Sequence, residues 1–256
     1  MYLPEEKIQI ILFTCSDVLF ASSLTIRKVS HLIGLFTSAR NAIRLGPLLC
    51  RFLNKDKVRA LSNSDNDFDQ KMELSLESKA EIKWWQDNIV NKNGKDIRPG
   101  KIEHYIETDA SKLGWGANFE DRKTGGRWSQ NESGLHINIL ECKAVYFALF
   151  SLCNHLHDTH IICIKCDNST TVAYLNNQGE SVITVHLQAK AIWLWSEEKR
   201  IYLTAVHTCI KGKSNITADY MSRHFSDSTE WKLHERVFQK ICRYFFMPAI
   251  DLFTTR

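Results

Sequence analysis

Four acidic side chains after residue 100 lie where an isolated carboxylate is costly. Asp109 follows a short predicted strand, and Asp167 follows the apolar run 161–166, which is typical of a buried strand. Glu141 lies in the first turn of a long predicted helix among apolar neighbours, and Asp219 lies in a short predicted helix. A buried carboxylate is unfavourable unless a partner neutralises it, so each of the four requires one.

Each acid also has an ordinary structural explanation. Asp167 is followed by Asn168 and Ser169, which suits a helix N-cap, and Glu141 is compatible with a solvated helix position. If the two strands are neighbours and both helices cross the same edge of the sheet, however, the four carboxylates converge. Like charges so close raise each other's pKa and repel unless divalent cations hold them. The set as a whole therefore predicts a divalent metal centre.

The acids lie within short motifs that follow one another in a characteristic order. These motifs are TDAS, GWGA, ECKA, CDNS and NITADYMSR, and successive acids are 32, 26 and 52 residues apart. In this order and spacing they resemble the ribonuclease H domain of retroelement polyproteins. Residues 1–92 resemble the thumb and connection that follow a reverse-transcriptase palm, through LPEEKI, TIRKVSHLIGLFTSA and AEIKWWQDN. The combination looks most like DIRS-type retrotransposons, which the segments EWKLHERVF and IDLFTTR also resemble.

The resemblance implies a reaction and a role for each acid. The reaction is endonucleolytic hydrolysis of the RNA strand of an RNA/DNA hybrid with two Mg2+ ions, for which Mn2+ is a possible substitute. Asp109 would bridge the two ions, and Asp219 would complete the one that holds the attacking water. Glu141 and Asp167 would complete the ion that stabilises the leaving 3′ oxygen. All four acids are thus expected to be both catalytic and metal-binding.

Further positions matched by the resemblance concern substrate binding. Ser111, Asn138 and Asn168 imply hydrogen bonds to 2′-hydroxyl groups in the wide minor groove, although capping or turn formation explains each of them as well. Lys213 lies where cellular type I enzymes have a histidine beside the metal ions, so it is also expected near the substrate. His207 lies earlier, at the end of a strand, and is more typical of a structural histidine than of a catalyst.

The rest of the pattern predicts a small all-α module followed by a mixed α/β domain. Helices are expected at about 4–19, 25–46, 47–61, 75–89, 138–156, 169–177, 183–198 and 215–223. Strands are expected at 105–108, 114–119, 126–129, 161–166 and 201–206, with Gly125 and Gly126 forming a turn. The expected fold is a ribonuclease H-like five-stranded mixed sheet flanked by helices. The expected boundaries are a thumb/connection-like module at 1–92, a linker at 93–102, a ribonuclease H-like domain at 103–226 and a tail at 227–256 leading toward a further polyprotein region.

Composition is that of an ordinary folded protein. Hydrophobic residues make up 44% and charged residues 24%, and 33 Lys and Arg against 29 Asp and Glu give a formal charge of +4. Disordered and collagen-like proteins are excluded, and the charge neither demands nor forbids a polyanionic partner. The sequence has no apolar run of the roughly 20 residues that a membrane span needs, and its start is too charged for a signal peptide. We expect no membrane partner and an intracellular location, cytoplasmic or nuclear and not secreted, with the eight cysteines reduced.

A polymerase needs a pair of adjacent metal-binding aspartates, and the sequence contains none. We therefore expect the chain to act with the palm and fingers of a parent polyprotein. Two other classes stay open: a catalytically weak or dead remnant that binds nucleic acid or supports a polymerase, and an integrase-like strand-transfer enzyme. The four acids argue against the first, and the fourth acidic segment argues against the second. The second helix is expected to bind the hybrid unless it is only a solvated face, through Arg27, Lys28, Arg40 and Arg44.

Overall fold

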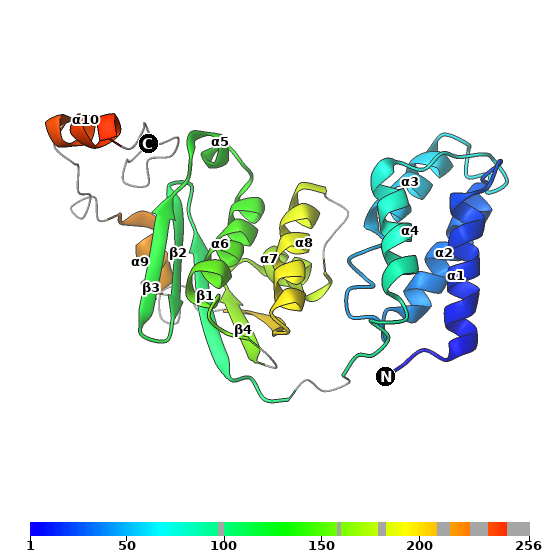
Figure 1. Ribbon diagram of the computed structural model, residues 1–256, viewed down its shortest axis with the longest axis horizontal. Helices are drawn as coiled ribbons and strands as arrows, with labels where there is room; N and C mark the ends of the chain where they lie inside the picture. The colour runs from blue at the N-terminus through cyan, green and yellow to red at the C-terminus, as the bar shows by residue number, and fades with distance from the viewer. Residues whose placement is uncertain (97–99, 158–159, 179–182, 209–215, 226–234, 245–256) are drawn as a thin grey trace.

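The computed structural model describes residues 1–96, 100–157, 160–178, 183–208, 216–225 and 235–244. Its first part consists of four helices: α1 (Glu5–Leu19), α2 (Ile26–Ala39), α3 (Arg51–Ser62) and α4 (Leu76–Asn88). They pack around one apolar core, in which the rings of Phe36 and Trp85 stack with their centroids 4.3 Å apart. Figure 1 shows these helices gathered beside the sheet that follows them. The predicted all-α part is confirmed.

Local sequence and one distant carboxylate set the ends of these helices. Thr25 and Ser75 cap α2 and α4, since each side chain accepts a hydrogen bond from the backbone N–H three residues on. The predicted bounds of two helices are wrong, because α2 ends at Ala39 and α3 begins at Arg51. The buried Glu81 carboxylate accepts hydrogen bonds of 2.9 to 3.1 Å from the first three backbone N–H groups of α3. A cap from another helix leaves no signal in the local sequence.

The second part is built on a five-stranded mixed sheet with the order β3-β2-β1-β4-β5. Its strands are β1 (His104–Ala110), β2 (Gly114–Phe119), β3 (Arg122–Arg127), β4 (Ile161–Cys166) and β5 (Tyr202–His207). β2 pairs antiparallel with β1 and β3, whereas β4 pairs in parallel with β1 and β5. The predicted mixed α/β class and five-stranded mixed sheet are confirmed.

Helices cover both faces of this sheet (Figure 1). The helices packed on its strands are α6 (Ile137–Leu152), α7 (Ser169–Asn176), α8 (Ile183–Glu198) and α9 (Ile216–Arg223). Two further helices are α5 (Gln130–Ser133) and α10 (Glu235–Tyr244), and α10 lies apart from the sheet in Figure 1. α6 and α8 share a core with the face of β2 that carries Ala117 and Phe119. α9 packs on β2 and β3 from the opposite face, where Gly116 lies. Within the described ranges, every helix is too short or too polar to cross a membrane.

Glycines in β2 and β3 allow α9 to approach the sheet closely. Gly116 and Gly125 lie opposite each other in the β2–β3 pair. A Cβ atom on Gly116 would lie 2.2 Å from the carbonyl oxygen of Ala218 and 2.6 Å from the backbone nitrogen of Ser222. A Cβ atom on Gly125 would also meet the backbone of α9. Because α9 carries Asp219, the position of the fourth predicted acid depends on these glycines.

The same close approach explains a wrong sequence prediction. The sequence predicts a turn at Gly125 and Gly126 and a strand at 126–129, but the strand begins already at Arg122. The chain reverses at Glu120, whose φ of 53° is in the left-handed region. Glycine is a common turn residue because it tolerates such angles. Here Gly125 lies inside a strand, where it provides space for a helix.

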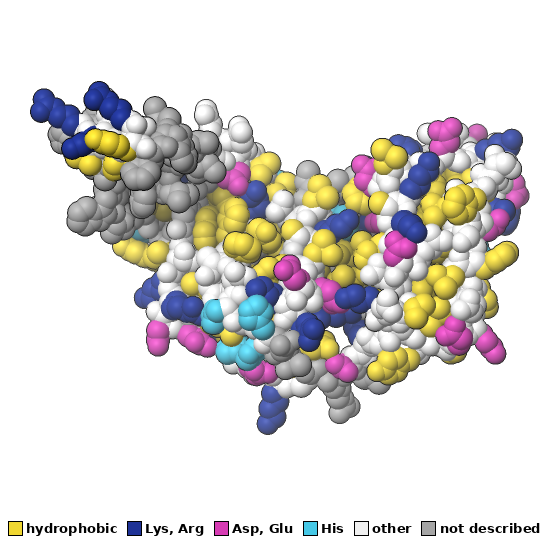
Figure 2. Space-filling model, viewed as in Figure 1, with side chains coloured by type: hydrophobic (Ala, Val, Ile, Leu, Met, Phe, Trp, Pro, Cys, Tyr) yellow, Lys and Arg dark blue, Asp and Glu magenta, His cyan; other side chains and the backbone are white. Residues whose placement is uncertain are grey.

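Arg44 joins the helical part to the sheet part. Its guanidinium donates hydrogen bonds to the Ser196 hydroxyl, at 2.8 Å, and to the Ile201 carbonyl. It also lies 3.4 Å from a carboxylate oxygen of Glu197 and 4.6 Å from the centroid of the Tyr202 ring. Figure 2 shows Lys and Arg side chains (dark blue) where the two parts meet. The expectation that Arg44 binds nucleic acid from an open helix face is therefore wrong, because its side chain is 16% exposed and has these partners.

Two other basic residues of α2 have acidic partners. Arg27 donates two hydrogen bonds to Asp69, of 2.7 and 2.9 Å. The Lys28 Nζ atom lies 3.1 Å from a carboxylate oxygen of Asp17. Exposed pairs of this kind contribute little to stability, but they neutralise the charge that a phosphate backbone would meet. The basic face predicted on this helix is largely neutralised.

Gly116→Ala tests the close approach of α9. The added methyl group has no room between β2 and the helix, so we expect the protein to lose about 1–3 kcal/mol of unfolding free energy in urea denaturation. Gly34→Ala is the matched control, because open space surrounds this exposed position of α2. That substitution should stabilise the protein by about 0.5–1 kcal/mol. Equal effects of the two substitutions would contradict the packing argument.

Arg44→Ala tests the junction between the two parts. We expect it to lower the unfolding free energy by about 1.5–3 kcal/mol, because it removes a charged hydrogen-bond donor from buried acceptors. Arg40→Ala is the control, since Arg40 is exposed on the same segment and its loss should change stability by no more than about 0.5 kcal/mol. Urea denaturation measures both variants. If both unfold like the wild type, Arg44 does not hold the parts together.

Candidate active site

The parallel pairing of β1 and β4 brings two of the predicted acids to one edge of the sheet. Asp109 is the penultimate residue of β1, and Asp167 directly follows β4. α6 packs on β1 and carries Glu141 to the same place. The three carboxylates line one open cavity of about 540 Å³. The sequence predicts Glu141 in the first turn of its helix, whereas it lies in the second turn of α6.

Two of these acids, Glu141 and Asp167, form a close group with Cys166. One potential ligand atom of each lies within 4.8 Å of the other two. Glu141 is 3% exposed and accepts a hydrogen bond of 3.6 Å from the Cys166 thiol. Asp109 is 4% exposed, and its Oδ2 accepts a hydrogen bond of 2.6 Å from the hydroxyl of Ser222. The Glu141 and Asp109 carboxylates are therefore buried and held in fixed orientations, whereas Asp167 is exposed.

Burial and mutual repulsion favour the protonated forms of two of these acids. Burial, followed by the charges of Asp109 and Asp167, raises the pKa of Glu141 to about 9. Burial also raises the pKa of Asp109, against the hydrogen bond from Ser222 and together with the charges of Asp167 and Asp219. A cation among these carboxylates would favour their ionised forms. Because carboxylate oxygens are preferred ligands of Mg2+ and Mn2+, the donor set fits such an ion.

Asp219 approaches the other acids from α9 but faces a partner of its own. Its carboxylate accepts a hydrogen bond of 2.8 Å from the Arg223 Nε, and both side chains of this pair are 53% exposed. Its charge reaches Asp109, whose pKa it raises. The cavity is lined by Arg223 and not by Asp219. The structure thus brings three of the four predicted acids into one cavity and leaves the fourth beside it.

The residues predicted to bind 2′-hydroxyl groups have partners within the protein. The Ser111 hydroxyl donates to the Ser222 carbonyl at 2.7 Å and accepts from the backbone N–H two residues on. Asn168 caps α7, since its Oδ1 accepts a hydrogen bond from the Thr171 N–H, and its Nδ2 donates to the Asn138 Oδ1 at 3.0 Å. Ser111 and Asn168 also line the cavity. Turn formation and capping therefore account for these two side chains, and the Asn138–Asn168 pair lies next to the acids.

Two predicted positions lie at the end of β5 and in the segment that follows it. Lys213 lies outside the described residues. His207 ends β5, and its Nε2 lies 2.9 Å from the carbonyl oxygen of Asp167. His207 is thus at the same edge of the sheet as the acids. Its part in any reaction stays a prediction.

Three residues that the sequence analysis did not assign belong to the site. Ser222 and Arg223 follow Asp219 at the i+3 and i+4 positions of α9, a spacing that indicates a shared helix face. Cys166, the third residue, has a buried thiol. Burial raises the pKa of its thiol well above the usual value, and the neutral thiol donates a hydrogen bond to Glu141. The helix spacing was a usable signal for the first two, whereas the thiol contact was not visible in the sequence.

Comparisons with known proteins give only a limited similarity to solved structures. No family model matches the chain, and no curated protein matches it. Among solved structures, ribonuclease H1 from the halophilic archaeon Halobacterium salinarum NRC-1 is similar over 48% of this chain and 94% of its own, with 15% identity and a TM-score of 0.35. The foamy viral protease-reverse transcriptase in complex with an RNA/DNA hybrid is similar over 91% of this chain, with 11% identity and a TM-score of 0.31. The native protease-reverse transcriptase of prototype foamy virus is similar over 74% of this chain, with 15% identity and a TM-score of 0.30.

The similarity is limited to part of the viral chains, of which this chain spans 30% and 26% in the two cases. Identities and TM-scores this low carry no argument about function, which has to be argued from the side chains of this chain. The DIRS-type assignment stays a prediction.

Glu141→Gln tests the cost of the buried carboxyl. The pKa of Glu141 in the folded protein is about 9, above the usual 4.5. Between these pH values the native state therefore keeps a proton that the unfolded chain loses. Stability of the metal-free protein should therefore fall as the pH rises from about 4.5 to about 9. At pH 8 with a chelator, the neutral amide should raise the Tm by about 3 °C, equivalent to ~1 kcal/mol, and this gain should vanish near pH 4.5. Differential scanning calorimetry at pH 8 and at pH 4.5 measures the two Tm differences.

Glu132→Gln is the matched control for this experiment. The Glu132 carboxylate accepts a hydrogen bond from the Ser129 hydroxyl and lies 2.9 Å from the Lys143 Nζ. Its neutralisation should lower the Tm at pH 8. A lower Tm for both variants would show that the Glu141 carboxylate is stabilised in the metal-free protein, contrary to the assignment.

Proposed function

We propose that this chain hydrolyses the RNA strand of RNA/DNA hybrids, as the C-terminal part of a retroelement reverse transcriptase. The observation that carries the proposal is the convergence of Asp109, Glu141 and Asp167 in one cavity where β1 and β4 end. These acids, with Asp219, would hold two Mg2+ ions or, as a substitute, Mn2+. When bound, the ions would activate a water molecule and stabilise the charge that develops on the scissile phosphate.

The chain's own residues fix the acids in place. The Ser222 hydroxyl holds one oxygen of Asp109, and the Cys166 thiol and the Ala110 backbone N–H hold Glu141. Groups that are already oriented and shielded from water do not have to reorganise during the reaction, which makes electrostatic stabilisation effective. Asp109 and Glu141 are buried and oriented, which supports a role in catalysis rather than that of charged surface residues.

Asp219 is proposed as the fourth acid. This assignment requires its carboxylate to leave the Arg223 guanidinium and bind a metal ion instead. The ion pair between them is half exposed, and such pairs contribute only about 0–1 kcal/mol. The exchange is therefore inexpensive. Asp219 already lies near enough to Asp109 for its charge to raise the pKa of that carboxyl group.

Recognition of the RNA strand is proposed for the amides beside the acids. The hydrogen bond between them orients Asn138 and Asn168. Each amide carries donors and an acceptor, and a 2′-hydroxyl group both donates and accepts. Ser111 and Lys213 complete the proposed substrate-binding set. This set would distinguish an RNA strand from a DNA strand.

The helical part is proposed as a thumb/connection-like module of a polyprotein that also contains a palm and fingers. The resemblance of residues 1–92 supports this, as does their packing against the sheet part through Arg44. The proposed divisions are a linker at 93–102, a ribonuclease H-like domain at 103–226 and a tail at 227–256. An intracellular location, cytoplasmic or nuclear, is part of the same proposal.

One observation favours a second candidate, a catalytically weak or dead remnant that binds nucleic acid or supports a polymerase. Asp219 is paired with Arg223, and this pairing keeps the fourth carboxylate occupied. The two candidates differ in outcome. The remnant would bind a hybrid in the presence of Mg2+ without cutting it.

Cleavage of a labelled RNA/DNA hybrid by the purified full chain tests the proposal. We expect Mg2+- or Mn2+-dependent cutting of the RNA strand that stops on chelation, while double-stranded DNA stays intact. Asp109→Asn should lower the cleavage rate by roughly 10² to 10³, because it removes one preorganised charged group from the site. Gel analysis of single-turnover reactions gives the rates.

Asp121→Asn is the matched control, because Asp121 is an exposed acid in the turn between β2 and β3. It should cut at the wild-type rate. Full activity of Asp109→Asn would show that the site is assigned wrongly. Equal cutting of double-stranded DNA would exclude a ribonuclease H reaction.

A further inference from the structure

A second group of side chains with metal-binding chemistry lies at the other edge of the sheet. Glu103 directly precedes β1, His104 begins it, and His160 lies just before β4. Because β1 and β4 run in parallel, the starts of both strands share the edge opposite to Asp109 and Asp167. Figure 2 shows histidine side chains (cyan) gathered on one face of this part of the molecule. The hydrolysis proposed above uses none of these three residues.

Sheet hydrogen bonds fix the backbone of this group. The Glu103 N–H donates to the Ile161 carbonyl at 3.0 Å, and the His160 carbonyl accepts from the Tyr202 N–H at 2.8 Å. His104 is paired in the β1–β4 ladder. The two segments are therefore brought together by the sheet itself, and a ligand does not have to assemble them. Such preorganisation lowers the cost of binding an ion.

The possible ligand atoms already lie at coordination distances from one another. The His160 Nδ1 lies 3.3 Å from the His104 Nε2 and 2.8 Å from the Glu103 Oε2. One ligand atom of each residue lies within 4.8 Å of the other two. Two ligands of a tetrahedral ion with bonds of about 2.0–2.1 Å are about 3.3 Å apart. The two imidazole nitrogens match this spacing. The Glu103 Oε2 lies closer to the His160 Nδ1 than this spacing, and the half-exposed Glu103 side chain can move away by a few tenths of an ångström.

A fourth residue orients one of the imidazoles. The Glu120 Oε1 lies 3.0 Å from the His104 Nδ1. An ionised carboxylate only accepts hydrogen bonds, so the proton is on this nitrogen, and the lone pair of the His104 Nε2 faces His160. A carboxylate behind the ring is the usual outer partner of a metal-binding histidine. Without a metal, one N–H of His160 has to serve both a carboxylate and an imidazole, whereas one metal ion would satisfy all three groups.

We propose that Glu103, His104 and His160 bind one divalent transition-metal ion of the Zn2+ class. Two imidazoles and a carboxylate select Zn2+, Co2+ or Ni2+ over Mg2+, which prefers oxygen ligands. Three protein ligands leave a coordination position for water. The ion joins the start of β1 to the start of β4, close to where the chain enters the sheet from the helical part. Its expected effect is to stabilise the folded state.

Metal titration of the full chain tests this proposal independently of any nuclease activity. Metal-free protein is titrated with Co2+ and then with Zn2+, in excess Mg2+ and a phosphine reductant. We expect one equivalent of Co2+ to give the visible absorption of an ion with nitrogen and oxygen ligands, and Zn2+ to displace it. We expect saturating Zn2+ to raise the Tm by about 5 °C.

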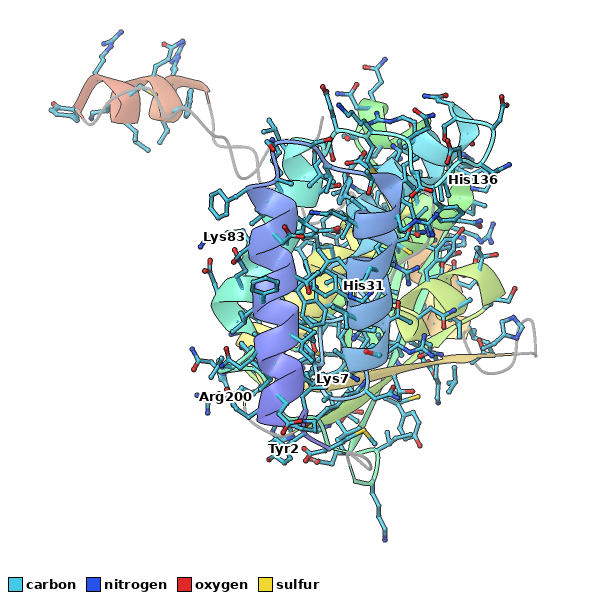
Figure 3. All side chains as sticks on the ribbon, turned by 90° about the vertical axis from the view of Figure 1, so that its right-hand side faces the viewer. Tyr2, Lys7, His31, Lys83, His136 and Arg200 are labelled. Atoms are coloured by element: carbon cyan, nitrogen blue, oxygen red, sulfur yellow. The ribbon has the colours of Figure 1, made fainter. Side chains whose placement is uncertain are left out.

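Matched variants locate the ion. His104→Gln and His160→Gln, each checked for folding by circular dichroism, should lower Zn2+ affinity at least about 100-fold and abolish the rise in Tm. Glu120→Gln keeps the three ligands and should weaken binding by roughly 10- to 100-fold. His31→Gln is the control, because His31 is exposed on α2 in the helical part (Figure 3) and does not belong to the proposed ligand group. Asp109→Asn should bind Zn2+ like the wild type, since the acids at the other edge are not involved.

Three results would overturn the proposal. The first is that the wild type shows no saturable binding of Zn2+ in excess Mg2+. The second is that His160→Gln and His104→Gln bind Zn2+ as tightly as His31→Gln. The third is a thiolate charge-transfer band with Co2+, which would place the ion on the cysteines.

Discussion

The parallel pairing of β1 with β4 is the constraint on which both proposed sites depend. Parallel strands place like ends at the same edge of a sheet. The ends of this pair bring Asp109 and Asp167 together, and its starts bring His104 and His160 together. The two edges differ in donor chemistry, with carboxylate oxygens at one and imidazole nitrogens at the other. The same backbone hydrogen bonds thus support one site suited to Mg2+ and another suited to Zn2+.

The acid edge carries a cost that the rest of the fold must offset. Burial raises the pKa of Glu141 to about 9, so the metal-free site resists ionisation. The compensation comes from apolar cores on either side, one under the sheet and one within helices α1–α4. Arg44 connects these two parts through acceptors on α8 and the start of β5. The buried acids lower the free energy of unfolding, and the apolar cores raise it. This arrangement is expected where side chains are selected for function rather than for stability.

Several elements were predictable from local pattern, and their failures have identifiable causes. The strand at 161–166 and the helix caps at Thr25 and Ser75 follow from apolar runs and N-cap preference. The third strand was placed wrongly because Gly125 was interpreted through its turn propensity, while its actual role is to leave space for α9. The start of α3 was missed because its cap is a carboxylate from α4. Both errors come from contacts between residues far apart in the sequence.

The sequence by itself determined which chemistry is available: four acids in recognisable motifs, a mixed α/β pattern and a helical part before it. Only the tertiary structure decided how close those acids come, that three share a cavity and that Asp219 faces Arg223. It also decided that Arg44 lies in a junction and that two histidines 56 positions apart point at each other. The physical reason is that residue type and local periodicity are properties of the chain, whereas burial, repulsion between charges and ligand distances arise only when strands pair and helices pack.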